Sequence, residues 1–284
     1  MKKLLITGGS GLLGRHFIQA FSKHYQITAT HHKRAPYMND HVEWINLDYT
    51  DFNQLNRLNK KFDYILHLAA ITHPETCEKY PKQSKHINFE LTKRIVDLAC
   101  KVNAKLIFTS TDLVFDGHKG LYCENDSVNP GSYYAEHKAL AESFILDNEP
   151  NSLVARLSVQ LTKDFNQGFY FDIIQKLKSK SKLNVFNDEF RSFTFACDTV
   201  RWLEKLKFEN GIWHLANTGG CSRSQLAYAL AKEYNYDPKY IDEISSKSID
   251  FKAYRPKDTR LCIDKFKTKY ADRVVDLKAH INSI

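Results

Sequence analysis

The amino-terminal half of the chain alternates between short apolar runs and segments with helical periodicity. The run from Lys3 to Thr7 ends in glycines, as a buried strand would, and apolar residues then recur at helical spacing from Leu12 to Phe21. The same pattern predicts further strands at 25–30, 42–47, 62–68, 105–108 and 153–157, and helices at 51–59, 81–102 and 134–146. Strands that alternate with helices predict a parallel sheet that is covered on both faces.

The pattern changes after about residue 160. Helices are predicted at 168–177, 199–206 and 224–234 and short strands at 183–186 and 212–215, before a Lys-rich tail. We therefore expect an α/β fold with a Rossmann-type, doubly wound parallel sheet over residues 1–160 and a smaller α+β, substrate-binding lobe over 161–284. No Pro/Gly/Ser-rich linker and no repeat separates the two, which favours interleaved lobes packed around one cleft.

Composition narrows the class of protein. The 284 residues are 43% hydrophobic and 26% charged, which argues against a disordered or coiled-coil protein. No run approaches the ~20 apolar residues of a membrane span, and the opening sequence is too short for a signal-peptide core, so we expect a cytoplasmic protein with no membrane partner. The six cysteines contain no C-x-x-C pair, so neither a disulfide framework nor a metal site is predicted.

The formal net charge is +8, but Lys and Arg are spread along the whole chain. The densest cluster, Lys176, Lys178, Lys180 and Lys182, is interpreted as a solvated helix end, so no nucleic-acid partner is predicted. A basic protein attracts anionic small molecules through its long-range field. The sequence leaves the oligomeric state open, with a homodimer as one option.

The turn TGGSGLLG carries the first candidate chemistry. Gly8, Gly9, Gly11 and Gly14 satisfy dinucleotide-binding spacings directly after a strand, and Leu12 and Leu13 open the following helix. Glycines allow the tight turn and the close approach of a pyrophosphate, whose charge the helix N–H groups bind. A P-loop is excluded because the Gly-Lys-Ser/Thr ending is missing.

The end of the second predicted strand indicates which dinucleotide binds. An acidic residue here would bind the ribose 2′-hydroxyl of NAD, whereas this chain has His31, His32, Lys33 and Arg34. Cations at this place suit the 2′-phosphate of NADP, so NADPH is the predicted cofactor, with NADH as the alternative. Asp48, after the third strand, is a candidate to accept a hydrogen bond from the adenine amino group, with a turn or cap role as the other option.

A phenol and an ammonium group are predicted to share one helix face. Tyr134 and Lys138 are four residues apart, about one helical turn, and follow a predicted strand that leads to Ser110 and Thr111. A second pair with the same spacing, Tyr228 and Lys232, is expected to be structural because it is far from the glycine turn. Parallel sheets bind ligands at their carboxyl edge, which favours the first pair.

Several strings together give the chain a family resemblance. TGGSGLLG, HLAA (67–70), Asn88, STDLVFDG (110–117), Pro130 and the Tyr134/Lys138 pair resemble the extended short-chain dehydrogenase/reductase family. STDLVFDG, GIWHLANTGGCSRSQLA and RPKDTRL are similar to the branch that contains dTDP-4-dehydrorhamnose reductase, over nearly the whole chain. That branch reduces 4-keto sugars attached to nucleoside diphosphates, for deoxysugar and polysaccharide synthesis.

The resemblance implies a role for each matching residue. Tyr134 would be the general acid, Lys138 would bind the nicotinamide ribose and lower the pKa of Tyr134, and Thr111 would bind the substrate carbonyl. The cofactor would also contact Leu68, Ala69, Ala70 and Ser110. The nucleotide-sugar substrate would contact Thr72, Thr111, Asp112, Arg191 and Arg255, of which the two arginines are candidates for the diphosphate.

Departures from the family pattern leave the substrate open. The family usually has a small hydroxyl residue before the lysine, where this chain has His137. Dehydratases of the superfamily carry Asp-Glu after the catalytic threonine, whereas Leu113 follows Asp112 here, which argues against dehydration. The alternatives that stay open are an NAD-dependent sugar-nucleotide epimerase and a non-catalytic regulatory subunit like that of methionine adenosyltransferase.

Overall fold

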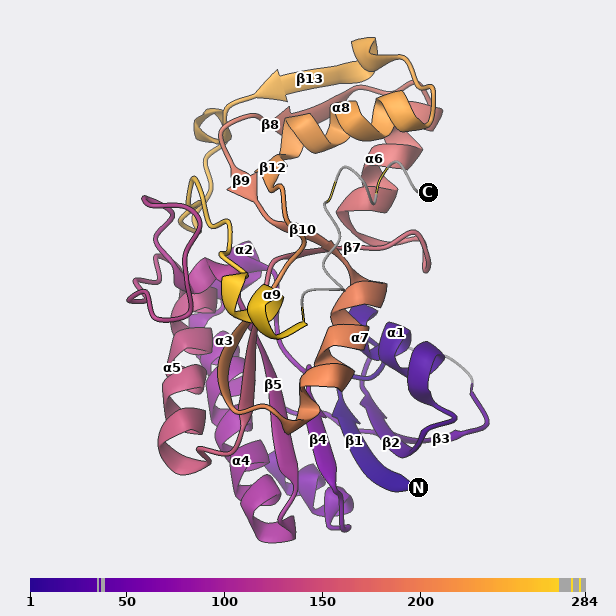
Figure 1. Cartoon of the computed structure of the whole chain (residues 1–284), viewed down its shortest axis with the longest axis vertical. Coiled ribbons are helices and arrows are strands. Elements are labelled where there is room, and N and C mark those ends of the chain that lie inside the picture. Colours follow the sequence, from indigo (N-terminus) through magenta and orange to yellow (C-terminus); the bar gives the residue numbers. More distant parts are fainter. Residues whose placement is uncertain (35, 37–38, 271–276, 278–280, 282–284) are drawn as a thin grey trace.

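A seven-stranded parallel sheet forms the centre of the structure, a computed structural model that describes residues 1–34, 36, 39–270, 277 and 281. Its strands lie in the order β11-β6-β5-β4-β1-β2-β3 (Figure 1). Their bounds are β1 Lys2–Thr7, β2 Tyr25–His31, β3 Val42–Asn46, β4 Tyr64–His67, β5 Lys105–Thr111, β6 Leu153–Leu157 and β11 Gly211–Leu215. The winding direction reverses between β1 and β4, which is the Rossmann topology, so the predicted fold class is confirmed.

Helices cover both faces of this sheet because successive side chains of each strand point to opposite faces. Leu4 and Ile6 of β1 pack in one buried cluster with α1 (Leu12–Phe21) and α7 (Ala196–Lys205). Leu5 packs in the other cluster, against α4 (Leu91–Val102) and α5 (Tyr133–Asn148). The continuous apolar run of β1 is therefore explained by burial on both faces.

The segment predicted as one helix over 81–102 is more complex. It consists of α3 (Pro81–Lys85), a π-helical turn (His86–Glu90) and α4, and a further helix that was not predicted, α2 (Pro74–Lys79), precedes it. The predicted helix over 51–59 is a 3₁₀ helix (Phe52–Leu58), which begins after Asp51 caps the N–H of Asn53. The 3₁₀ helix and the π-helical turn keep the apolar spacing expected of an α-helix, so periodicity alone could not distinguish these helix types.

The smaller part of the molecule lies beyond the carboxyl ends of the central strands (Figure 1). Its buried cluster joins residues of α6 (Gly168–Lys178), α8 (Arg223–Glu233) and short paired strands. The strand pairs are β7 (Val159–Leu161) with β10 (Phe193–Phe195), β8 (Leu183–Phe186) with β13 (Ile241–Ile244), and β9 (Phe190–Arg191) with β12 (Cys221–Ser222). Of the predicted Lys-rich tail, α9 (Asp264–Tyr270) is a helix, and residues 271–276, 278–280 and 282–284 lie outside the described residues.

Two elements that follow residue 160 lie in the layers of the large sheet. The strand predicted at 212–215 is β11, which pairs in parallel with β6 at the edge of the central sheet rather than in the smaller lobe. Helix α7 packs against α1 beside it. A short apolar run predicts a strand but not the strand with which it pairs, so the sequence could not show that β11 joins the central sheet. No helix within the described residues is both long and apolar enough to cross a bilayer.

Candidate active site

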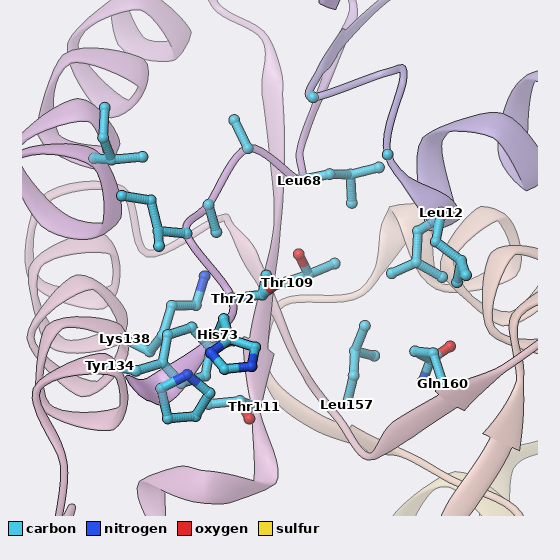
Figure 2. A pocket seen from close by; sticks show the side chains of 18 of the residues that line it. Leu12, Leu68, Thr72, His73, Thr109, Thr111, Tyr134, Lys138, Leu157 and Gln160 are labelled. Atoms are coloured by element: carbon cyan, nitrogen blue, oxygen red, sulfur yellow. The ribbon is translucent and has the colours of Figure 1, made fainter. Parts of the chain in front are cut away.

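One large cleft, with a volume of about 1250 Å³, lies between the central sheet and the smaller part. It is lined by the glycine turn, by the ends of β2, β4, β5 and β6, by the start of α5 and by the start of α6. Figure 2 shows lining side chains from the start of α1 (Leu12), from β5 (Thr109 and Thr111) and from α5 (Tyr134 and Lys138). The predicted site residues that line it are Gly8, Gly11, Leu12, Leu13, Gly14, His31, Lys33, Arg34, Asp48, Leu68, Ala69, Ala70, Thr72, Ser110, Thr111, Asp112, Tyr134, Lys138, Arg191 and Arg255. Gly9 is not among the lining residues.

The glycine turn presents the start of α1 to the cleft. Gly8 has φ +69°, in the left-handed region, and a Cβ there would lie 2.9 Å from backbone atoms of Ala69. Gly11 is the N-cap of α1 and supplies no side chain to bind the first N–H groups of the helix. A Cβ on Gly14 would lie 2.5 Å from the carbonyl oxygen of Gly9, so a glycine at position 14 permits close packing of α1 on the turn. The turn therefore offers helix N–H groups to an anion.

Basic residues follow β2 at one end of the cleft. His31 ends the strand, and Lys33 and Arg34 are exposed and line the cleft. Arg34 donates a hydrogen bond of 2.5 Å from Nη1 to Oε1 of Gln167, from the smaller part of the molecule. The Asp48 carboxylate accepts from the N–H and hydroxyl of Thr50, and these hydrogen bonds hold the pKa of Asp48 below its usual value. Lys33 and Arg34 give this end of the cleft positive charge, and their exposure leaves it open to solvent.

The three predicted catalytic residues, Thr111, Tyr134 and Lys138, lie together in the cleft, away from the basic residues that follow β2. Thr111 is the last residue of β5, and Ser132 caps α5 through the N–H of Ala135, which sets where Tyr134 and Lys138 begin the helix. Tyr134 and Lys138 are 8% and 3% exposed, and Figure 2 shows them on adjacent turns of α5, facing the end of β5. The Lys138 Nζ lies 3.9 Å from the centre of the Phe108 ring. All three side chains face the cleft that holds the glycine turn.

Burial controls protonation here. It lowers the pKa of Lys138 to about 7, although the Glu142 carboxylate opposes this shift. Burial and the charge of Asp112 raise the pKa of Tyr134 well above its usual value, and a hydrogen bond from Thr111 opposes them. Lys138 is not among the causes of this shift, so the expectation that it lowers the pKa of Tyr134 stays a prediction. Tyr134 is a protonated phenol at neutral pH.

The backbone of residues 68–71, which follows β4, is held in place by side chains beneath the cleft. The Thr7 hydroxyl accepts from the N–H groups of Leu68 and Ala69 at 3.1 and 3.2 Å. Asn88, in the π-helical turn, accepts from the N–H of Ile71 at 2.8 Å and donates to its carbonyl at 3.0 Å. Both contacts hold the backbone that carries Ala70 and Thr72 along the cleft, and π-turns are frequent at such sites.

The departure at position 137 lies outside the cleft. His137 is 4% exposed, and its Nδ1 shares a 2.8 Å hydrogen bond with Ser84, which also accepts from Asn88. The imidazole therefore supports α3 and the π-turn rather than contacting a ligand. Replacing the family's small hydroxyl residue with histidine leaves the cleft side of α5 unchanged.

Three arginines converge at the cleft end near the smaller part. The Glu189 carboxylate is fully buried and pairs with Arg255 at 2.7 Å, Arg223 at 3.3 Å and Arg191 at 3.5 Å. Burial would raise the pKa of Glu189, but the hydrogen bond from Arg255 and the three charges hold it below its usual value. Asp112 and Asp258 also act on the charge of Arg191, but Asp258 is paired with Arg260, so the guanidinium groups still outnumber the carboxylates. The three arginines, here named the arginine cluster, therefore suit a polyanionic ligand.

Asp112 lies between the arginine cluster and the catalytic group. It is 3% exposed, accepts a 2.6 Å hydrogen bond from Thr259 and accepts one of 3.3 Å from Thr111. Burial raises the pKa of Asp112 above its usual value, against the nearby charge of Arg191. Its carboxyl group is thus fixed in orientation where a substrate beside Thr111 would pass.

A dinucleotide fits the residues that are present. The Ser110 Oγ and the Gln160 Oε1 are buried in the cleft wall without a hydrogen-bond partner among the described residues. Buried polar atoms usually have a partner, so both are free to bind a ligand. Together with the uncapped start of α1 and the basic residues after β2, they would hold a nicotinamide dinucleotide along the cleft. Among the described residues no group of three His, Cys, Asp or Glu side chains could hold a metal ion.

Sequence reasoning missed many residues that line the cleft, among them Arg223, Gln160 and Gln167. Arg223 begins α8, and only the buried Glu189 brings it beside Arg191 and Arg255. Gln160 and Gln167 lie in or after β7, where no motif marks them. Arg223 lies within the family-like string GIWHLANTGGCSRSQLA, which could have marked it, whereas the places of Gln160 and Gln167 depend on how the smaller part packs onto the central sheet.

The fold and this site define an oxidoreductase of the extended short-chain dehydrogenase/reductase class, which uses NAD(P). More narrowly, the chain belongs to the RmlD substrate-binding domain family, whose model matches residues 1–284.

Individual relatives carry two different names. The beta subunit of methionine adenosyltransferase 2 from Bos taurus is 24% identical over 279 residues, covering 94% of this chain and 82% of that protein. The crystal structure of a hypothetical dTDP-4-dehydrorhamnose reductase from Sulfolobus tokodaii is 29% identical, with a TM-score of 0.84 and 94% coverage of each chain. The dTDP-4-dehydrorhamnose reductase from Bacillus anthracis, solved in complex with NADP, shares the fold at 23% identity, with a TM-score of 0.87.

Proposed function

We propose that this chain reduces a 4-keto sugar attached to a nucleoside diphosphate, with NADPH as the reductant. One observation carries the proposal: Thr111, Tyr134 and Lys138 face the same cleft as the glycine turn and the arginine cluster. A dinucleotide at the turn and a diphosphate at the arginines would both extend toward Tyr134. The relatives named as dTDP-4-dehydrorhamnose reductases support this substrate class.

The buried phenol suits the acid step of such a reduction. When NADPH is bound, it supplies the hydride that reduces the carbonyl carbon. The carbonyl oxygen then becomes negatively charged, and Tyr134 donates its proton to that oxygen to complete the alcohol. Thr111 donates a hydrogen bond to the same oxygen, so the two hydroxyl groups stabilise the developing charge.

Lys138 and the cleft walls complete the arrangement. The ammonium form of Lys138 would bind hydroxyl groups of the nicotinamide ribose and favour the phenolate that Tyr134 becomes. Burial of Thr111, Tyr134 and Lys138 excludes bulk water, which strengthens these electrostatic interactions.

The two charged ends of the cleft would bind the two anionic molecules. Arg34 and Lys33 would bind the 2′-phosphate of NADPH, and Arg34→Glu should therefore raise the KM for NADPH by at least tenfold while changing the KM for NADH much less. An equal effect on both cofactors, measured by steady-state kinetics, would reject the assignment of the 2′-phosphate. At the other end, the arginine cluster would bind the substrate diphosphate, and Asp112 a sugar hydroxyl.

The assay that tests the proposal follows the nicotinamide absorbance of NADPH. The purified protein is incubated with NADPH and a panel of 4-keto sugars linked to thymidine, uridine or guanosine diphosphate. We expect stoichiometric oxidation of NADPH with at least one of them. An epimerase would convert its substrate without net consumption of NADPH, which separates the two reactions.

A second candidate function rests on the similarity to the methionine adenosyltransferase beta subunit over 94% of this chain. In that case the cleft would bind a dinucleotide without turning over a substrate, and the protein would associate with a methionine adenosyltransferase catalytic subunit. Co-elution with that subunit in gel filtration, together with no NADPH oxidation in the panel, would favour this function. The fixed orientation of Tyr134 and Thr111 toward the cleft favours the reductase.

A further inference from the structure

One hydrogen bond joins the two parts of the molecule across the basic end of the cleft. Its donor is Arg34, after β2, and its acceptor is Gln167, the N-cap of α6, at 2.5 Å. The two residues are 133 positions apart in the chain. Both line the cleft, and Gln167 is half-buried there. The position of the Arg34 side chain is therefore set by a residue outside the predicted dinucleotide motif.

The segment that carries Gln167 is anchored to α1. We call residues 162–168 the strap. Thr162 shares a 2.8 Å hydrogen bond with the buried His16 of α1, and the ring of Phe165 lies edge-on to His16 with centres 4.9 Å apart. The guanidinium carbon of Arg15 lies over the Phe165 ring, 5.5 Å from its centre. The strap is thus fixed to the same helix whose start faces the cleft.

The strap holds an unfavourable backbone conformation. Phe165 and Asn166 have φ values of +68° and +38°, and Gly168 has +86°. A bulky residue such as phenylalanine rarely adopts the left-handed region, and when it does, tertiary contacts must compensate the backbone strain. Strain of this kind is concentrated at functional sites, where it fixes a side chain that would otherwise be mobile.

We propose that Gln167 is a specificity-determining residue that holds Arg34 over the adenosine end of the cleft and thereby favours NADPH over NADH. This inference rests on the proposed use of NADPH. A glutamine suits the role because its carboxamide oxygen is neutral, so the guanidinium keeps its full charge and its remaining donors for a phosphate.

The other end of the same carboxamide adds a donor. The Nε2 of Gln167 is buried and has no hydrogen-bond partner among the described residues. A 2′-phosphate oxygen beside Arg34 would accept from it, whereas the 2′-hydroxyl of NADH offers neither the charge nor the reach. The pair therefore supplies a fixed charge and a neutral donor at one place, which lowers the entropic cost of binding the phosphate.

The experiment measures binding of NADPH and NADH by titration calorimetry, so it needs no sugar substrate. Gln167→Glu keeps the shape but pairs the guanidinium with a carboxylate, and we expect an about tenfold loss of NADPH affinity, as for a lost hydrogen bond to a charged group. Gln167→Ala removes both the acceptor for Arg34 and the Nε2 donor without adding a charge, and we expect an about threefold loss. Both variants should bind NADH within about twofold of the parent protein.

Two controls make the outcome specific. Lys163→Gln changes the net charge of the strap by the same amount as Gln167→Glu, but Lys163 is exposed and does not line the cleft, so NADPH affinity should change by less than about twofold. In an Arg34→Ala background, Gln167→Glu should lower NADPH affinity by a smaller factor than in the parent protein, because the carboxylate then has no guanidinium to neutralise. Thermal melting of each variant checks that the fold is retained.

The results separate this inference from the proposed function. A selective loss of NADPH affinity in both Gln167 variants, clearly smaller in the Arg34→Ala background, supports it. An equal loss for NADH, an unchanged affinity in either variant, or a loss of the same size without Arg34 overturns it. If Arg34→Ala itself leaves the preference for NADPH unchanged, the cofactor assignment in the proposed function fails instead.

Discussion

The chain contains two tyrosine–lysine pairs with the same spacing, and their surroundings differ in almost every respect. Tyr134 and Lys138 are buried at the carboxyl edge of the central sheet and line the large cleft. Tyr228 is 38% exposed on α8 in the smaller part, and Lys232 is exposed one turn further on. Neither residue of the second pair lines the cleft.

The comparison shows what a spacing of four residues can and cannot determine. It places two side chains on one helix face, whatever the helix. Catalysis also requires that this helix face lies beside a bound cofactor, and which helix does so depends on the strand that precedes it. Helix α5 follows β5, whose end supplies Ser110 and Thr111, whereas α8 follows the two-residue strand β12. The position in the sheet, more than the motif, marks the candidate active site.

Removing each phenol in turn should produce the largest difference between the two pairs. We expect Tyr134→Phe to lower kcat by at least about a hundredfold, because general acid catalysis contributes about that much or more. Binding of NADPH should be retained. The matched variant Tyr228→Phe should leave kcat within about twofold of the parent protein, as measured by NADPH oxidation with a reactive 4-keto sugar. Equal effects of the two variants would remove the distinction between the pairs.

Thr111 lies beside Tyr134 at the end of β5, so its replacement tests what completes the first pair. Thr111→Val preserves the shape but removes the donor to the carbonyl oxygen, and we expect kcat to fall about tenfold to a hundredfold. Thr111→Ser keeps the hydroxyl and should restore most of the rate. A valine variant with the kcat of the parent protein would show that Tyr134 and Lys138 suffice.

The smallest expected effect concerns the pH dependence of stability. Burial lowers the pKa of Lys138 in the folded protein to about 7 from its usual value of 10.5, so the unfolded chain binds this proton more tightly. The stability of the folded state should therefore rise as pH increases from about 7 toward 10. We expect the free energy of unfolding of the parent protein, relative to Lys138→Met, to increase by about 1 kcal/mol for each pH unit of this window.

Chemical denaturation of the parent protein and of Lys138→Met at pH 7.5 and at pH 9.5 measures how their difference in unfolding free energy changes within this window. The control Lys232→Met should show the same pH dependence as the parent protein, since Lys232 is exposed. A difference between the parent and Lys138→Met that stays constant with pH would mean that Lys138 is as accessible to water as Lys232.

The sequence predicts the central sheet well because its signal is local. Continuous apolar runs such as 3–7 and 153–157 require burial on both faces, and glycines after the first run require a tight turn. The structure brings the predicted residues of the turn, of β5 and of α5 to one cleft, with Gly9 as the exception. Alternation of strands and helices is sufficient to place these strand ends at one edge of the sheet.

The remaining features depend on contacts between distant segments. Glu189 gathers three arginines from β9, from α8 and from the segment after β13, and no local pattern links them. The edge position of β11 depends on the exposed edge of β6, and the contact between Arg34 and Gln167 depends on the strap. The raised pKa of Tyr134 likewise follows from burial that only the packed structure defines.

Transfer of a labelled hydride tests the central claim most directly. NADPH that carries deuterium at the reactive position of the nicotinamide is incubated with the protein and a 4-keto nucleotide sugar, and the product is analysed by mass spectrometry and NMR. If Tyr134 and its cleft perform carbonyl reduction, one deuterium appears at C4 of the product sugar for each NADPH oxidised. A bound but unoxidised NADPH, or a sugar altered without gain of the label, would contradict the account.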